Sequence, residues 1–209
     1  MQIPIRKSFF ILLSFLCILL LMHLFVHHIS WAIHNIGMFN LDTEANIPTW
    51  YSTILLFLVS LCSLIVYRIR VNGITRSERG NAFWLFLAIV YCFLSMDEAA
   101  RIHEFIHGYT CIKWFYTYAP FGALIFIITA VYFSVIRSNY KDLRIWILGG
   151  LICYASGGLV AEFLSHYFSP LSPVLQQVEF MFEEGMEMFG TSMVLMGCFT
   201  ELNHLNAQT

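Results

Sequence analysis

The stretch "NAFWLFLAIVYCFLSMDEAARIHEFIHG", residues 81–108, joins an apolar run to a run of charged residues. Its first half contains one polar side chain and no charge, which is typical of a helix that contacts lipid. Its second half contains three acids, an arginine and two histidines. The pattern predicts one continuous helix over about residues 82–107 that crosses a membrane and carries a polar site at one end.

The whole chain has the composition of a membrane protein. Of its 209 residues, 59% are hydrophobic and 11% are charged, whereas about a quarter are charged in soluble domains. A helix needs roughly 20 mostly apolar residues to cross the hydrocarbon core of a bilayer. Windows of this kind cover about residues 9–31, 48–67, 82–107, 119–137, 145–167 and 175–199. The sequence therefore predicts an all-α fold, with residues 1–209 forming a single integral membrane bundle of six transmembrane helices.

Basic residues concentrate in the segments that this topology places on one side. Nine of the 11 Lys and Arg residues lie before the first helix, between the second and third, or between the fourth and fifth. Because Lys and Arg accumulate in cytoplasmic loops, both termini are expected in the cytoplasm of a bacterial cell, with the protein in the inner membrane. Membrane lipids and partner membrane subunits are the expected partners. The net charge of −2 indicates no nucleic-acid partner.

Acids and histidines gather at the opposite, outer end. Ten of the 13 acids and seven of the 8 histidines lie there, with only Arg101 and Lys113 as basic residues. An ionised side chain at membrane depth costs about 2.5–3.5 kcal/mol and usually faces the bundle interior or an aqueous cavity. The acids inside apolar helices are therefore expected to be protonated or to bind a cation.

Helical periodicity groups these residues into stripes, because side chains three and four positions apart share a face. The stripes are Glu179, Glu183 and Glu187 on the sixth helix, with Glu184 pointing away; Gly158, Glu162 and His166 on the fifth; His23, His27 and His34 on the first; and Asp97, His103, Glu104 and His107 on the third, with Arg101 beside Asp97. Four helices thus carry ligand-type residues at similar depth. A purely structural polar network is the alternative interpretation.

Carboxylate plus imidazole is the ligand set of zinc, iron or manganese. The string "HEFIH", residues 103–107, matches H-E-x-x-H, in which two histidines bind zinc and the glutamate between them is the general base. Glu104 and His107 also have the Glu-x-x-His spacing found in helical bundles that hold two irons or manganeses. The expected cofactor is a divalent metal, either zinc or iron/manganese.

These patterns assign a role to each candidate residue. The predicted catalytic residues are Glu104 and Asp97. The predicted metal ligands are His103, His107, Glu183, Glu187, Glu162 and His166. The residues predicted to support the site, or to fold over it as a lid, are Glu98, Arg101, Glu179, Glu184, His23, His27, Asp42 and Glu44.

Two kinds of function fit this site. The first is a metal-dependent membrane enzyme, a hydrolase or an oxidoreductase, that acts on a lipid-borne or periplasmic substrate. The second is a non-enzymatic cation or proton carrier, or an accessory subunit of a larger membrane complex. A carrier needs polar residues through the inner half of the bundle, where the sixth helix offers only Thr191, Ser192 and Thr200 below Glu187. The enzyme is therefore the preferred hypothesis.

Paired glycines occur at positions 149–150 and 157–158 of the fifth predicted helix. Small residues let helix backbones approach closely in lipid, so these pairs predict tight helix packing. A cleft beside Glu162 is the functional alternative.

Three segments of the chain resemble small, uncharacterised multipass membrane proteins of bacteria. They are "FNLDTEANIPTWYS" before the second helix, "SMDEAARIHE" at the end of the third and "EEGMEMFG" in the sixth. The resemblance extends over most of the chain and implies a site at these motifs. It implies no particular chemistry, because that group has no named activity.

Overall fold

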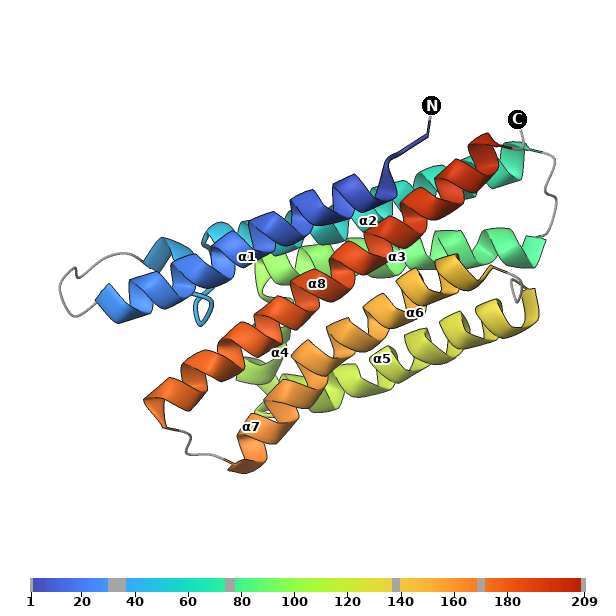
Figure 1. The fold of residues 1–209 in the computed structure, drawn as a ribbon. Coiled ribbons are helices and arrows are strands. Elements are labelled where there is room, and N and C mark those ends of the chain that lie inside the picture. Colours follow the sequence, from blue (N-terminus) through green and yellow to red (C-terminus); the bar gives the residue numbers. More distant parts are fainter. Residues whose placement is uncertain (1, 30–36, 74–77, 137–139, 169–171, 208–209) are drawn as a thin grey trace.

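The computed structural model describes residues 2–29, 37–73, 78–136, 140–168 and 172–207. These residues form helices and short connections and contain no strand, so the predicted all-α fold is confirmed for this part of the chain. The long helices lie side by side in a bundle, with the two termini near each other at one end (Figure 1). We call this end the termini end.

The helices have the following bounds. They are α1 (Ile5–Ile29), the short η1 (Gly37–Phe39), α2 (Ile47–Asn72), α3 (Glu78–Ala100), α4 (Ile102–Thr110), α5 (Trp114–Val131) with the π-helical η2 (Tyr132–Ile136), α6 (Lys141–Ala155) with the π-helical η3 (Ser156–Ala161), α7 (Glu162–Phe168) and α8 (Pro173–Asn206). The helix that was expected over 145–167 thus consists of α6, η3 and α7.

Among the residues that the structure describes, five helical segments are long and apolar enough to cross a membrane. They are Ile5–Val26, Ile47–Asn72, Gly80–Ala100, Trp114–Ile136 and Lys141–Phe168. The helix α8 is longer, at 34 residues, but it lies outside this group. Its glutamates lower its hydropathy, because each replaces an apolar side chain in the window that would cross the lipid.

The prediction of a continuous third helix over 82–107 is wrong. Arg101 adopts left-handed backbone angles, φ 57° and ψ 42°, so that α3 ends at Ala100 and α4 begins at Ile102. The Asp97 carboxylate accepts the backbone N–H of His103 at 2.8 Å. It thereby satisfies a donor in the first turn of α4 that an uninterrupted helix would pair with a carbonyl group. The helix breaks where a side chain can replace that backbone partner.

Glycines allow α6 and α8 to approach at backbone distance. A Cβ atom added to Gly150 would lie 2.6 Å from the carbonyl oxygen of Gly190, and one added to Gly190 would lie 2.5 Å from the backbone nitrogen of Tyr154. No side chain fits at such a separation. Gly150 therefore serves close packing, as the sequence predicted for the pair at 149–150, and its partner across the contact is Gly190.

A buried ion pair fixes the termini end. The Nη1 atom of Arg70 at the end of α2 lies 2.5 Å from Oε1 of Glu201 on α8, and both residues are almost completely buried. Asn81 of α3 accepts the Nε–H of Arg70 at 3.2 Å. Nearby, the backbone N–H of Ile3 donates to the Asn203 side chain at 2.7 Å. Three helices and the N-terminal segment are thus held together by polar contacts at this end.

Candidate functional site

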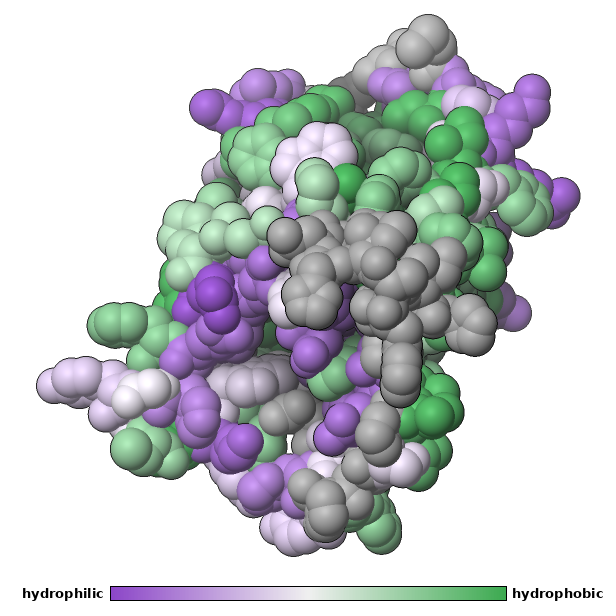
Figure 2. Space-filling model, turned by 90° about the vertical axis from the view of Figure 1, so that its left-hand side faces the viewer, coloured by the Kyte–Doolittle hydropathy of each residue, from purple (hydrophilic) through white to green (hydrophobic). Residues whose placement is uncertain are grey.

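The ligand-type residues lie at the other end of the bundle, around the start of α4. We call it the acidic end. It faces the viewer in Figure 2, where hydrophilic side chains gather left of the centre and below it, with hydrophobic ones above and to the right. Four parts of the chain contribute to it: the loop before α2, the end of α3, α4 and the first half of α8.

Asp97 is the structural centre of this end. It is 7% exposed, and its Oδ1 atom accepts both the hydroxyl of Tyr118, at 3.0 Å, and the backbone N–H of His103. Its Oδ2 atom lies 3.3 Å from Nδ1 of His103. With these three partners Asp97 orients the imidazole, which is how a carboxylate behind a metal-binding histidine acts.

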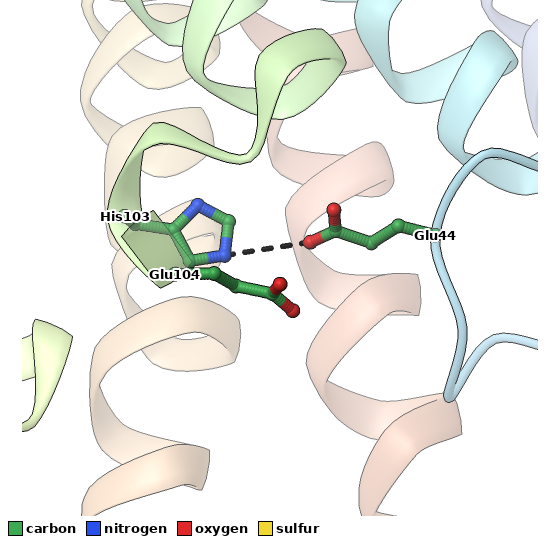
Figure 3. A group of neighbouring side chains, drawn as sticks. All are labelled: Glu44, His103 and Glu104. Carbon is green, nitrogen blue, oxygen red and sulfur yellow. Dashed lines mark ion pairs between the residues drawn. The ribbon is translucent and has the colours of Figure 1, made fainter. Parts of the chain in front are cut away.

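Three side chains converge in front of Asp97. Glu44, His103 and Glu104 each offer a ligand atom, and these atoms lie within 4.8 Å of one another, so this outer group could hold a metal ion. Figure 3 shows the Glu44 and His103 side chains pointing toward each other from the loop and from α4, with Nε2 of His103 3.5 Å from Oε1 of Glu44. Arg101 makes ion pairs with Glu44, at 2.5 Å, and with Glu104.

The outer group has perturbed protonation. Burial disfavours a charged His103, but the hydrogen bond with Asp97 and the negative charges of Asp97, Glu44 and Glu98 outweigh burial and raise its pKa. Burial and the charge of Glu104 raise the pKa of Glu44, against the opposing effect of His103 and Arg101. Both groups therefore hold protons more tightly than usual. Bound cations would compete with those protons.

A second group, which we call the inner carboxylate group, consists of three half-buried acids, Glu98 of α3 with Glu184 and Glu187 of α8. The three acids interact electrostatically with one another, and Glu98 and Glu184 also interact with Glu44 of the outer group. Glu98 has a side-chain hydrogen bond with Ser52, and Glu187 has one with Tyr154. Glu184, which was expected to point away from Glu179, Glu183 and Glu187, interacts electrostatically with Glu98, Glu183 and Glu44.

A glycine makes room for the carboxylate of Glu187. A Cβ atom added to Gly158 of η3 would overlap Oε1 of Glu187, and one added to Gly157 would meet the Cγ atom of Glu187 at 3.1 Å. The Glu187 carboxylate therefore lies directly against the η3 backbone. Single π-helical turns inside longer helices are frequent at functional sites. The second glycine pair thus positions a site residue as well as packing two helices.

Other predicted site residues lie elsewhere. His107 hydrogen-bonds through Nδ1 to the carbonyl oxygen of Ile112 at 2.9 Å and is outside the outer group, so the structure does not unite the two histidines of "HEFIH". His166 is exposed, with its ring 5.8 Å from that of Phe115. His23 is buried and accepts the backbone N–H of Leu41 at 3.0 Å.

The remaining candidates divide into two sets. Glu179 and Glu183 are half-buried on α8, Glu183 interacts with Glu184 and Glu187, and Asp42 is exposed in the loop before α2. The other set lies outside the described part of the chain: the side chains of His27 and Glu162, and the whole of His34. Gly158, Glu162 and His166 were predicted to share one face. Gly158 lies against Glu187, whereas His166 is exposed, so these two residues do not share a face.

Sequence reasoning missed three hydroxyl groups of the site. The hydroxyl of Tyr118 donates to Asp97. Tyr154 and Ser52 contact the inner carboxylate group. Their positions in the sequence were a usable signal. Ser52 and Tyr118 lie about one turn after the first residues of α2 and α5, and Tyr154 lies four residues from both Gly150 and Gly158.

Residues 10–202 match the model of a family described as Domain of unknown function (DUF8692). The match spans most of the chain, which therefore belongs to this family. No curated protein and no solved structure matches the chain.

Proposed function

We propose that this member of a family of unknown function is a metal-dependent enzyme of the bacterial inner membrane. In this proposal α8 is the sixth membrane-crossing helix, and the termini end faces the cytoplasm because the basic residues of α1, α2 and α6 gather there. The acidic end then faces the periplasm. The divalent cation, zinc or iron/manganese, binds there, and the substrate comes from the lipid or the periplasm.

The observation that carries the proposal is the meeting of the two carboxylate groups. The half-buried Glu98, Glu184 and Glu187 interact electrostatically with one another, and Glu98 and Glu184 also interact with Glu44 of the outer group. Several acids taken out of water repel one another unless a cation or protons neutralise them. Imidazole and carboxylate oxygens together suit zinc, iron or manganese, and a cation between the groups would polarise a substrate oxygen or activate water.

The inner half of α8 favours an enzyme over a carrier. The hydroxyls of Thr191, Ser192 and Thr200 donate to carbonyl oxygens four residues earlier in the same helix, at 2.8–2.9 Å. Met188, Val194 and Met196 fill the adjacent core and are fully buried. These hydroxyls are therefore bonded within their own helix, which supports the enzyme over the carrier.

Elemental analysis of the purified protein tests the proposal. Detergent-purified wild type, Glu187→Gln, Gly158→Ala and Asp142→Asn are compared by mass spectrometry, with folding checked by circular dichroism. We expect about one equivalent of zinc, or two of iron or manganese, in the wild type and in Asp142→Asn, which removes an exposed acid at the termini end. Zinc would indicate hydrolysis, whereas iron or manganese would indicate oxidation.

The two site variants should lose metal for different reasons. Glu187→Gln removes a ligand charge, and we expect at least tenfold less bound metal. Gly158→Ala keeps every ligand but displaces the Glu187 carboxylate, so we expect a comparable loss. Folded wild type without metal, or equal metal in all four proteins, would contradict the proposal.

A further inference from the structure

The helix α4 connects two candidate membrane spans at the same end of the bundle. One span ends at Ala100 and the next begins at Trp114. The nine residues of α4 lie between these ends, and left-handed residues at Arg101 and Cys111 separate them from both spans. A helix in this position lies at the level where lipid gives way to water.

The two faces of α4 differ in character. Phe105 and Tyr109 expose 74% and 84% of their surface, whereas His103 points inward to Asp97 and Glu44. At 100° per residue, positions 103 and 105 lie about 200° apart around the helix axis. One face of α4 therefore carries bare aromatic rings, and the opposite face carries the imidazole of the outer group.

Further exposed apolar groups continue the aromatic face. Ile112, directly after α4, is 50% exposed, and the hydroxyls of the exposed Tyr116 and Tyr167 lie 3.4 Å apart. Tyrosine at the ends of membrane helices contacts both the acyl chains and the headgroups. The surface beside the outer group thus matches the boundary region of a bilayer.

We propose that α4 lies in the bilayer interface and holds the outer group at headgroup depth, where its ligand is the headgroup of a phospholipid. Phe105 and Tyr109 enter the acyl boundary, and His103 and Glu104 hold the cation on the other side of the helix. Phosphate oxygens are ligands both for a divalent cation and for a guanidinium such as that of Arg101, which is 52% exposed at the edge of the group. The headgroup assignment rests on the proposed cation site, whereas the position of α4 does not.

Photo-crosslinking tests the position of α4. The variants Phe105→benzoylphenylalanine and Tyr109→benzoylphenylalanine are placed in nanodiscs of phosphatidylethanolamine and phosphatidylglycerol and irradiated. Mass spectrometry should detect phospholipid adducts at both positions and at least tenfold fewer in Ala207→benzoylphenylalanine, an exposed position at the termini end. Adducts no more frequent at 105 and 109 than at 207 would overturn the interfacial placement, whatever metal the protein contains.

Native mass spectrometry tests the ligand. Phosphatidylethanolamine and its soluble headgroup, glycerophosphoethanolamine, are added to metal-stripped protein with and without Mn²⁺. We expect Mn²⁺ to raise retention of the phospholipid at least fivefold and to leave the soluble compound weakly bound, with the gain lost in Glu104→Gln. Equal retention with and without Mn²⁺, or tight binding of the soluble compound alone, would overturn the headgroup assignment. Adducts at 105 and 109 in a protein that binds no metal would instead contradict the proposed function.

Discussion

The two ends of the bundle bury charge in opposite ways. At the termini end, one guanidinium and one carboxylate pair at 2.5 Å, and Asn81 binds the guanidinium. At the acidic end, Glu98, Glu184 and Glu187 are set against one another, and their neighbour Glu44 is a further acid. About 21 Å of helix rise separate Glu187 from Glu201 on the same α8.

The difference distinguishes a structural contact from a binding site. A balanced pair satisfies itself and requires nothing from outside the chain. A group of like charges is less stable when empty and gains most from a bound cation or proton. Buried polar residues of a membrane protein therefore indicate function most clearly where their charges do not cancel.

The largest effect is expected from breaking the balanced pair. Glu201→Leu leaves the buried Arg70 without its carboxylate and should lower the free energy of unfolding by about 3–5 kcal/mol. Unfolding by sodium dodecyl sulfate in mixed micelles measures this value. In Arg70→Met/Glu201→Leu both charges are replaced, and most of the loss should be recovered. A single variant as stable as the wild type would show that the pair does not hold α2 to α8.

An opposite sign is expected at the acidic end. In metal-stripped protein, Glu187→Gln removes an acid that the fold must either keep protonated or hold against like charges, and above neutral pH it should raise the free energy of unfolding by about 1–2 kcal/mol. The same unfolding assay applies, and saturating Mn²⁺ should reverse the order, since only the wild type is stabilised by the ion. Destabilisation of the stripped protein by this substitution would indicate that Glu187 is satisfied within the fold, as Glu201 is.

The smallest effect concerns pH. The raised pKa of His103 stabilises the folded state below the ordinary value of 6.5, and this contribution is lost as the pH rises through the folded-state pKa. The raised pKa of Glu44 acts in the same direction, because the folded protein retains its proton above the ordinary value of 4.5. The free energy of unfolding of metal-stripped protein should therefore fall as the pH rises above 6.5.

Replacement of the imidazole isolates its share of that slope. In His103→Gln, the free energy of unfolding should decrease less steeply with pH. The difference in slope should be a fraction of about 1.4 kcal/mol per pH unit, which is the value for one whole proton. His166→Gln, which replaces an exposed histidine at the same end, is the matched control. An unchanged slope in His103→Gln would contradict the assignment of the pH dependence to the outer group.

The sequence by itself determined the all-helical class of the fold and the kinds of residue that gather at one end of it. Apolar windows long enough to cross lipid identify the helices from composition alone, because every residue in lipid must be compatible with hydrocarbon. The same constraint makes the acids and histidines at one end conspicuous. His103 and Glu104, which together with Glu44 could hold a metal ion, were therefore picked out without any knowledge of packing.

Only the tertiary structure decided which of these residues meet. Helical periodicity assumes an unbroken helix, and a left-handed Arg101 and a π-helical η3 each change the angular register of all that follows. For this reason His166 leaves the face predicted for Gly158, and Glu184 interacts with Glu98 of a distant segment. His107 shares the unbroken α4 with His103, but its imidazole hydrogen-bonds to the carbonyl oxygen of Ile112. Periodicity could not reveal the hydroxyl partners either, because it describes one helix at a time. Tyr118 and Tyr154 contact the site residues only in the folded bundle.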